Sequence, residues 1–577
     1  MQRILRLFCL PIWCMLVLVG CNESQTKKLK IVCSTDVHGN FFPYDFCSDS
    51  SSTGSLARVS SYLNGEREVY GDNLLFIDAG DILQGQPTSY YYNTQAIEEP
   101  HLAAEVLNYL KCDAATLGNH DIEPGGATYQ RYIGDCHFPV VCGNIYFEDS
   151  ETPFLPPYTI KECDGVKVAI LGLITPAVPN WLPRNLWRGL EFIDMELAAR
   201  RWMDYLHRYE QPDVVVGLFH SGYEGGIVTD SYAENAARSV AEQVPGFDVV
   251  FYGHDHTERN TQVVNVVGDT VLLLNPANNA NSVATVEITY SKQGNDKVQL
   301  ALSPAIVNVD DLEPDARFLE KFSSQMEKVK AYVSRRVGTF TQAMDARKAY
   351  FGPSEYVDFI HRMQLDITSA QISFAAPLSY DALIPAGDIH VRDLFKIYRY
   401  ENQLYLMRLS GREIRDYLEM SYSLWINGMS SSEDPLLLFS DVRTSKPTLK
   451  NAYYNFDSAA GIIYDVDVTK PSGQRVIIKS LADGKPFELD KIYYVAVNSY
   501  RGNGGGELLT KGAGIPKEEL EGRIEYATDA DLRFYLYHYI EGRGMVTPQS
   551  LGQWRFVPEG WVKQAALRDS QRLFGRF

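Results

Sequence analysis

The chain has 577 residues, of which 45% are hydrophobic and 12% aromatic, as is typical of globular proteins. This length is too great for one ordinary hydrophobic core and indicates two domains. The net charge of −19 argues against binding to duplex nucleic acid, because proteins that bind the phosphate backbone usually carry a basic face. The negative charge does not exclude small anionic substrates, since bound metal ions would invert the local charge.

Residues 1–21 have the features of a targeting segment. Two arginines precede an apolar stretch, residues 7–19, that is too short for a membrane-spanning helix. The stretch ends in LVGC, which resembles a bacterial lipoprotein cleavage box and implies lipid on Cys21. Two acyl chains there would anchor the protein stably in the bacterial cell envelope, on the periplasmic face or the cell surface, with residues 22–28 as a spacer. A plain secretory signal cleaved nearby is the alternative.

All nine cysteines lie at or before Cys163, and six of them follow Cys21. In an exported domain these six thiols can pair in many ways, and the sequence does not choose among them. No CxxC motif occurs, which argues against a cysteine zinc site. The six are Cys33, Cys47, Cys112, Cys136, Cys142 and Cys163.

From residue 29 to about residue 309, apolar runs typical of buried strands alternate with helical patterns. This alternation predicts a layered α/β domain. Five of the runs each end in a cluster of His, Asp and Asn, and ligands in open α/β sheets bind where strands end. The runs with their clusters are residues 29–40, 74–81, 115–121, 214–222 and 249–256.

The five clusters contain the ligand types of a hydrolytic metal centre. Asp36 and His38 are two residues apart and can face one ion, and Asp78 ends its run in DAGD, where Gly80 allows a tight turn. Imidazole, carboxylate and amide oxygen without thiolate suit zinc, manganese, cobalt or iron more than copper. Two such ions roughly 3.5–4 Å apart are the usual arrangement for phosphoester hydrolysis. The remaining candidates are Asn119, His120, His220, His254 and His256.

A connector and a second domain follow. Apolar residues spaced three and four apart over residues 313–336 predict one amphipathic helix that ends near Gly338. We therefore expect a first domain at 29–310, a linker at 311–345 and a second domain at 346–577. The second domain is rich in tyrosine, with predicted strands at 403–409 and 492–497 and a helix at 411–422, which indicates an α+β fold.

The order D-x-H, GD, GNH, H, GHxH resembles the calcineurin-like metallophosphoesterases. The longer segments STDVHGNFFPYD, DAGDILQGQP, LGNHDIE, HSG and FYGHDH resemble the 5′-nucleotidase family, together with its 2′,3′-cyclic-nucleotide phosphodiesterase/3′-nucleotidase branch. The resemblance covers residues 29–558. It implies a four-layer α/β/β/α metallophosphoesterase domain joined by a helix to an α+β nucleotidase domain.

The resemblance also implies roles for single residues. One ion would be held by Asp36, His38, Asp78 and His256, and the other by Asp78, Asn119, His220 and His254, so that Asp78 bridges them. His120 would bind a phosphate oxygen and stabilise the charge of the transition state. Glu123 would orient His120, although an exposed loop carboxylate is an equal alternative.

In this family the C-terminal domain binds the nucleoside. The resemblance places Tyr454 or Phe456 on one side of the base and Tyr500 on the other, where stacking tolerates any base. Without the resemblance, such aromatic residues would be read as core. The Asn-Gly-Gly-x-x-Arg segment usual in 5′-nucleotidases is missing from residues 372–389, which favours the cyclic-phosphodiesterase branch.

The sequence thus predicts an exported phosphohydrolase with two divalent ions (Mn, Zn, Co or Mg) that directs activated water onto small nucleotides. We expect 2′,3′-cyclic nucleotides and 3′-nucleotides as substrates, no duplex nucleic acid as partner, and membrane attachment through the lipid anchor alone. One alternative is a 5′-nucleotidase or nucleotide-sugar hydrolase. The other is a catalytically silent nucleotide-binding surface protein.

Overall fold

The computed structural model describes residues 27–291, 299–440 and 447–575. Cys21 and the targeting segment lie outside this range, so lipidation at Cys21 stays a prediction. Within the described residues, no helix combines the length and apolar character needed to cross a bilayer. The six cysteines from Cys33 to Cys163 all carry free thiols.

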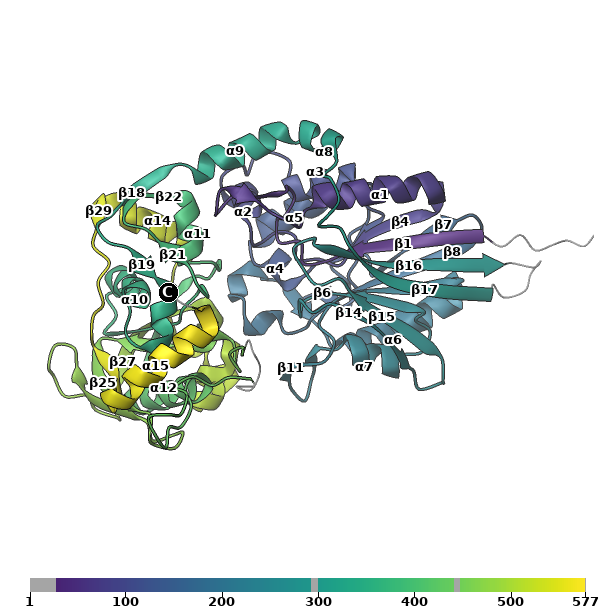
Figure 1. Cartoon of the computed structure of the whole chain (residues 1–577). Helices are drawn as coiled ribbons and strands as arrows, with labels where there is room; N and C mark the ends of the chain where they lie inside the picture. Colours follow the sequence, from purple (N-terminus) through teal and green to yellow (C-terminus); the bar gives the residue numbers. More distant parts are fainter. Residues whose placement is uncertain (1–26, 292–298, 441–446, 576–577) are drawn as a thin grey trace, which may run out of the picture.

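Two sheets form the centre of the N-terminal domain (Figure 1). The first has the order β17-β16-β1-β4-β5, with β1 parallel to β4 and β4 parallel to β5. The second has the order β14-β15-β13-β10-β8-β7, with β10 parallel to both β8 and β13. The strands of the first sheet are β1 (Lys27–Ser34), β4 (Leu74–Asp78), β5 (Ala114–Ala115), β16 (Ser282–Ser291) and β17 (Gln299–Asn308). Those of the second are β7 (Tyr158–Cys163), β8 (Val166–Ile174), β10 (Val214–His220), β13 (Val249–Tyr252), β14 (Arg259–Val264) and β15 (Thr270–Asn275).

The inner faces of the two sheets pack on each other through fully buried side chains such as Ile31, Ile77, Val216 and Phe251. Helices α1 (Leu56–Tyr70), α3 (Leu102–Tyr109) and α5 (Gly126–Asp135) cover the outer face of the first sheet, and α6 (Met195–Tyr205) and α7 (Ala237–Gln243) cover that of the second (Figure 1). Helix α6 packs on the sheet with one apolar face, because its buried residues are spaced three and four apart. The predicted α/β/β/α order is confirmed.

The connector consists of two helices, α8 (Ala316–Lys321) and α9 (Ser323–Val333), so the prediction of one continuous helix was wrong. Phe322 separates them with φ −100° and ψ 13°, outside helical geometry. Its buried ring packs against Phe318 and Tyr109, at centroid distances of 4.8 and 5.7 Å. Burial of both phenylalanines in the first domain therefore breaks the helix that the spacing predicts.

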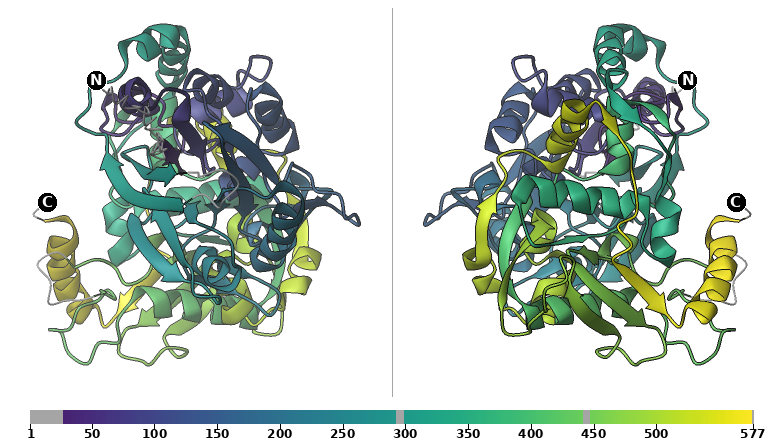
Figure 2. Two further views of the ribbon diagram at one scale, coloured as in Figure 1. Left: turned by 90° about the vertical axis from the view of Figure 1, so that its right-hand side faces the viewer. Right: turned by 90° about the vertical axis from the view of Figure 1, so that its left-hand side faces the viewer.

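The C-terminal domain is built on a mixed sheet with the order β24-β20-β27-β23-β28, which agrees with the predicted α+β class. Three smaller sheets of the domain have the orders β22-β18-β29, β26-β25-β30 and β19-β21. Their strands are β18 (Arg336–Phe340), β19 (Met344–Asp345), β21 (Leu383–Ile384), β22 (Gly387–His390), β25 (Ile462–Asp467), β26 (Val476–Leu481), β29 (Met545–Val546) and β30 (Trp554–Val557). Helix α15 (Glu559–Phe574) lies at its periphery in both views of Figure 2. The strands of the main sheet are β20 (Ile372–Ala375), β23 (Leu404–Ser410), β24 (Ser458–Ala460), β27 (Ile492–Asn498) and β28 (Ile524–Ala527), and its helices are α10 (Glu355–Thr368) and α12 (Gly411–Trp425).

A buried arginine joins the two domains. Arg533, on α14 (Leu532–Arg543), has a side chain only 2% exposed. Its guanidinium lies between the ring of Tyr90, from α2 (Pro87–Thr94) of the first domain, and the ring of Phe395, at 4.5 and 4.0 Å. It donates to the carbonyl of Tyr398 at 3.2 Å and lies 3.6 Å from the carboxylate of Glu401.

We expect Arg533→Ala to destabilise the protein strongly, because it leaves the buried Glu401 carboxylate without its cation. Removing one partner of a buried pair costs about 3–5 kcal/mol. Chemical denaturation followed by tryptophan fluorescence measures the change. Arg555→Ala is the matched control: Arg555 pairs with Asp465 with 55% of its side chain exposed, and we expect a much smaller effect because exposed pairs are screened. Equal effects of the two substitutions would contradict this role for Arg533.

Candidate metal centre

The strand ends bring the predicted ligands together as two groups. One contains Asp36, His38 and His256, and the other contains Asp81, His220 and His254. Within each group, the candidate ligand atoms lie within 4.8 Å of one another. Loops after β1 and β13 supply the first group, and β10 itself ends at His220. The division agrees with the predicted one for Asp36 and the four histidines, whereas Asp81 stands in place of Asp78 and Asn119 is in neither group.

In the second group, one ring nitrogen of His220 bonds to the backbone and the other faces the carboxylate of Asp81. Nδ1 lies 2.8 Å from the carbonyl of Ala79, which only accepts, so Nδ1 carries the proton. Nε2 then presents a lone pair 3.1 Å from Oδ2 of Asp81, buried and without a hydrogen bond among the described residues. Two such acceptors face each other stably only when a proton or a metal cation lies between them.

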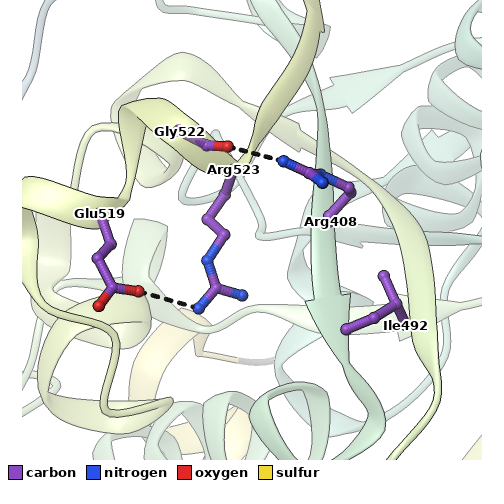
Figure 3. A pocket seen from close by; sticks show the side chains of 5 residues that line it. All are labelled: Arg408, Ile492, Glu519, Gly522 and Arg523. Atoms are coloured by element: carbon purple, nitrogen blue, oxygen red, sulfur yellow. Dashed lines mark hydrogen bonds and ion pairs between the residues drawn. The ribbon is translucent and has the colours of Figure 1, made fainter.

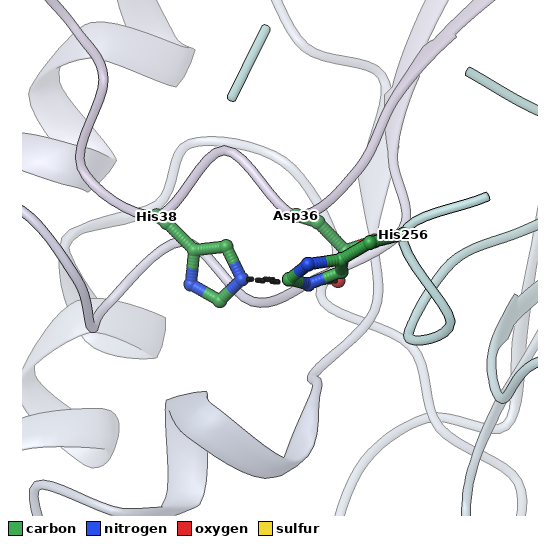
Figure 4. A group of neighbouring side chains, drawn as sticks. All are labelled: Asp36, His38 and His256. Carbon is green, nitrogen blue, oxygen red and sulfur yellow. Dashed lines mark hydrogen bonds and ion pairs between the residues drawn. The ribbon is translucent and has the colours of Figure 1, made fainter. Parts of the chain in front are cut away.

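The first group also brings ring nitrogens and a carboxylate together. Nδ1 of His38 lies 3.1 Å from the carbonyl of Gln84, and its Nε2 lies 3.1 Å from Nε2 of His256. The same nitrogen of His256 lies 3.2 Å from Oδ1 of Asp36, and Figure 4 shows the two rings directed at one point beside this carboxylate. Asn119 adds a buried Oδ1 with no hydrogen-bond partner in the described part of the chain. The convergent nitrogen and oxygen atoms of the two groups fit borderline divalent cations.

The assignment of Asp78 as a ligand was wrong, and Asp81 takes its place. The carboxylate of Asp78 accepts from the hydroxyl of Ser34 at 2.6 Å and from the amide of Gly80 at 3.1 Å. Burial raises the pKa of Asp78 to about 7, whereas His220 and His120 outweigh burial and hold the pKa of Asp81 well below its usual value. The turn after β4 thus keeps position 78 within the sheet and brings position 81 to the cluster.

The ligand-bearing turns depend on unusual backbone geometry. Asp36, His38, Asp81, His254 and His256 have φ between 49° and 78°, a region that non-glycine residues enter at a cost of about 1–3 kcal/mol each. Such outliers cluster where function requires them.

Glycines next to these turns allow close approach. A Cβ on Gly118 would lie 2.0 Å from Oδ1 of Asp81, and one on Gly253 would lie 2.4 Å from Oδ2 of Asp36. A glycine immediately precedes the cluster residue in GD, GNH and GHDH alike, and this repeated signal identifies Asp81.

Asp121, which the sequence prediction did not include, holds the turn that carries Asp81. Its fully buried carboxylate accepts four backbone amides at 2.7–2.9 Å, from Asp81, Ile82, Leu83 and Gly118. Burial raises the pKa of Asp121 to about 6, although the amide donors act in the opposite direction. Asp121 therefore joins the second and third strand-end clusters into one unit.

His120 and Glu123 form a pair beside the cluster. Nδ1 of His120 lies 2.6 Å from Oε2 of Glu123, whose side chain is only 4% exposed, while 29% of His120 reaches solvent. Burial lowers the pKa of His120, but Asp81 and Glu123 outweigh it and raise this pKa to about 9. The structure thus places a partly exposed imidazole beside the ligand groups, with Glu123 as its buried partner.

The predicted base-binding aromatic residues separate into two kinds. Tyr454 is 37% exposed, and its ring meets the half-buried Tyr500 edge-on, at 6.4 Å and 84°. Phe456 has no exposed surface and stacks on Trp425 at 5.5 Å with nearly parallel planes. The prediction of a substrate contact was therefore wrong for Phe456, which belongs to the hydrophobic core.

Arg501, a residue missed as a candidate, ties the two aromatic loops together. Its guanidinium is 2% exposed and donates to both carboxylate oxygens of Asp457, at 3.0 and 3.1 Å. It also donates to Oδ1 of Asn455 at 2.8 Å and to the carbonyl of Gly505 at 3.0 Å. These bonds fix the spacing between the Tyr454 loop and the Tyr500 loop.

A surface hollow of about 400 Å³ also lies in the C-terminal domain (Figure 3). Arg408, Ile492, Glu519, Gly522 and Arg523 line it. Its charged groups are already paired, Arg408 with Glu525 at 2.6 Å and Arg523 with Glu519 at 3.1 Å. None of the residues that line the hollow belongs to the ligand groups or to the aromatic loops.

Comparison with known proteins agrees with this geometry. Residues 29–258 match the calcineurin-like phosphoesterase family, and residues 336–511 match the 5′-nucleotidase C-terminal domain. The chain is 27% identical over 96% of its length to the trifunctional nucleotide phosphoesterase protein YfkN of Bacillus subtilis, but spans only 41% of that protein. It is 25% identical over 92% of its length to the 2′,3′-cyclic-nucleotide 2′-phosphodiesterase/3′-nucleotidase of Haemophilus influenzae, and covers 87% of it. The 5′-nucleotidase precursor from Thermus thermophilus shares the fold, with a TM-score of 0.63 at 21% identity, over 92% of this chain and all of that one.

The chain therefore belongs to the family in which a calcineurin-like phosphoesterase domain precedes a 5′-nucleotidase C-terminal domain. The two family models and the relatives named nucleotidases support a metal-dependent nucleotide phosphoesterase.

Asp81 and Asp78 provide a matched pair that tests the ligand assignment. We expect Asp81→Asn to lower the amount of bound Mn²⁺ and to abolish phosphoesterase activity, because the ionised carboxylate is lost from the second group. We expect Asp78→Asn to keep both metal and activity, since the amide oxygen can accept from Gly80 while the amide nitrogen donates to the Ser34 hydroxyl. Metal analysis of the purified variants after dialysis measures the difference. Loss of metal from Asp78→Asn alone would restore the original assignment.

Proposed function

We propose that this protein is an exported phosphohydrolase that uses two divalent cations to hydrolyse 2′,3′-cyclic nucleotides and 3′-nucleotides. The observation that carries the proposal is the pair of ligand groups, Asp36–His38–His256 and Asp81–His220–His254, beside the His120–Glu123 pair. Asp81 is the proposed bridge between the ions, because it replaces Asp78 in the predicted ligand set.

The residues around the ligand groups have different roles in the proposed hydrolysis. When bound, the two cations would supply the positive charge that binds the phosphate and lowers the pKa of water toward neutrality. His120 is placed to donate a hydrogen bond to a phosphate oxygen whose charge increases in the transition state. Glu123 accepts from the other ring nitrogen and keeps the imidazole in the donating orientation.

The aromatic pair supports a nucleotide as the substrate. The partly exposed ring of Tyr454 and the ring of Tyr500 stand on loops held by Arg501. Stacking of a base contributes about 1–3 kcal/mol and tolerates base identity. Because the two rings meet edge-on, we place the base against the exposed face of Tyr454, beside Tyr500, and the phosphate at the cations.

Two observations favour the cyclic-phosphodiesterase branch. Three relatives from Haemophilus, Yersinia and Salmonella bear the name 2′,3′-cyclic-nucleotide 2′-phosphodiesterase/3′-nucleotidase, at 24–25% identity over 92–96% of this chain. The segment in which 5′-nucleotidases carry an arginine has buried Ala375 and Ala376 here, with 5% and 3% exposure. A relative named 5′-nucleotidase, from Vibrio cholerae, is 23% identical over 84% of the chain, so that activity remains the second candidate.

We also propose attachment to the cell envelope through lipid on Cys21, on the strength of the LVGC sequence. Mass spectrometry of the N-terminal peptide from the natural host measures this. A lipidated Cys21 at the mature N-terminus is the expected result, and a different cleavage site would contradict it.

Substrate profiling tests the activity. We expect the purified protein with Mn²⁺ to release phosphate from 3′-AMP, to open 2′,3′-cyclic AMP, and to hydrolyse 5′-AMP more slowly. Turnover of 5′-AMP alone would contradict the proposal and favour a 5′-nucleotidase or nucleotide-sugar hydrolase. Bound metal without turnover of any nucleotide would favour the silent binding protein.

A variant of His120 tests the proposed role of its imidazole. We expect His120→Ala to lower kcat about 100- to 1,000-fold, as removal of one charge-stabilising donor does in other enzymes. Bound Mn²⁺ should stay unchanged, because His120 belongs to neither ligand group. His137→Ala, at an exposed position of the first domain, is the control with unaltered kcat. An unchanged kcat in His120→Ala would show that this imidazole does not touch the reacting phosphate.

A further inference from the structure

Trp181 connects the metal centre with the aromatic loops of the C-terminal domain. It directly follows the short helix η2 (Val178–Asn180), in the segment after strand β8 of the second sheet. Its half-buried indole packs on the imidazole of the ligand His254, with centroids 5.4 Å apart and planes inclined by 33°. One side chain of the first domain thus covers a ligand of the proposed second cation.

Two side chains of the C-terminal domain donate hydrogen bonds to backbone carbonyls of the loop that carries Trp181. Nδ2 of Asn503 donates to the carbonyl of Trp181 at 3.3 Å, and Nζ of Lys517 donates to the carbonyl of Pro179 at 3.4 Å. Asn503 follows α13 (Ser499–Gly502), the turn that carries Tyr500, and its own Oδ1 accepts from Tyr405 at 3.4 Å. The loop that carries a base-binding ring is therefore bonded directly to the residue that covers His254.

Glu234 lies against the same ligand histidine as Trp181. It stands on β12 (Ala233–Asn235), and its carboxylate lies 3.3 Å from Nε2 of His254. Trp181 and Glu234 of the first domain therefore both contact His254, and the Asn503 hydrogen bond joins the Trp181 loop to the loop of Tyr500.

We propose that Trp181 forms the wall of the substrate site that contacts the sugar of the nucleotide, and that the Asn503 hydrogen bond sets its position. The inference rests on the proposed nucleotide hydrolysis. A nucleotide with its base at Tyr454 and Tyr500 and its phosphate at the cations has its sugar between them, where Trp181 lies. An indole offers a wide apolar face to the CH groups of a ribose. Trp181 is thus a specificity residue, and Asn503 is a positioning residue that acts through it.

The test compares two tryptophans with the same replacement. Trp187 lies in the same segment, stacks under Arg184 at 4.0 Å and donates to the carbonyl of Leu182 at 3.0 Å, away from the ligand groups. We expect Trp181→Leu to raise KM for 3′-AMP and 2′,3′-cyclic AMP about tenfold, the loss typical of a central aromatic contact. Hydrolysis of bis(p-nitrophenyl) phosphate, which has no sugar, and the bound Mn²⁺ should stay unchanged. Trp187→Leu should leave all of these as in the unaltered protein, and Asn503→Ala should raise KM in the same direction by a smaller factor.

Two results would overturn the inference. One is a KM for both nucleotides that changes less than twofold in Trp181→Leu. The other is a parallel loss of metal and of bis(p-nitrophenyl) phosphate hydrolysis, which would show that Trp181 only supports His254. Failure of the proposed function is a separate result: the unaltered protein would then hydrolyse bis(p-nitrophenyl) phosphate but no nucleotide.

Discussion

The arrangement of the first domain depends on carboxylates and imidazoles, most of them buried, that converge at the strand ends. Asp81 and His220 meet at 3.1 Å, and Asp36, His38 and His256 converge within a similar distance. Such an array is costly without positive charge inside it, because burying unpaired polar groups and charges is unfavourable. The surrounding structure keeps it in place: Asp121 holds four amides of the turns that carry Asp81 and precede Asn119, and left-handed backbone at five cluster positions directs the ligands inward. The parallel strands supply the rigid edge from which all these turns start.

Two buried arginines position the second domain and its aromatic loops relative to the ligand groups. Arg501 binds Asp457 and the loops of Tyr454 and Tyr500, so it shapes the base site from within the domain. Arg533 lies between Tyr90 and Phe395 and determines how the domain meets the first one. Tyr90 stands on α2, whose preceding residue Gln86 donates its amide to the carbonyl of His38 at 2.9 Å. The domain contact and the first ligand group are therefore joined by one short stretch of backbone.

The sequence predicted the layers and most of the ligands because both follow from local patterns. Continuous apolar runs identify buried parallel strands, and the residues after them must meet at one edge of the sheet. Asp78 and Asp81 show the limit of this reasoning: Asp78 ends the strand and Asp81 follows three residues later, and of the local signals only the glycine before Asp81 indicates which carboxylate reaches the cluster. Phe456 and Tyr454 differ in the same way, since two residues of one loop face the core and the solvent.

Contacts between distant segments left no sequence signal. Phe322 breaks the connector because its ring is buried against Tyr109, more than two hundred residues earlier in the chain. The meeting of Trp181 with Asn503, and of Arg533 with Tyr90, likewise depends on how two complete domains pack. Periodicity and motif spacing describe one segment at a time, so such pairs become visible only in the folded structure.

The central claim is that Asp81 stands between two cations. A crystal structure of the protein grown with Mn²⁺, with anomalous difference maps recorded near the manganese edge, measures this most directly. We expect two peaks about 3.5–4 Å apart, one beside Asp36, His38 and His256 and the other beside Asn119, His220 and His254, with Asp81 as a ligand of both. A single peak, or a peak bound by Asp78 instead of Asp81, would contradict it.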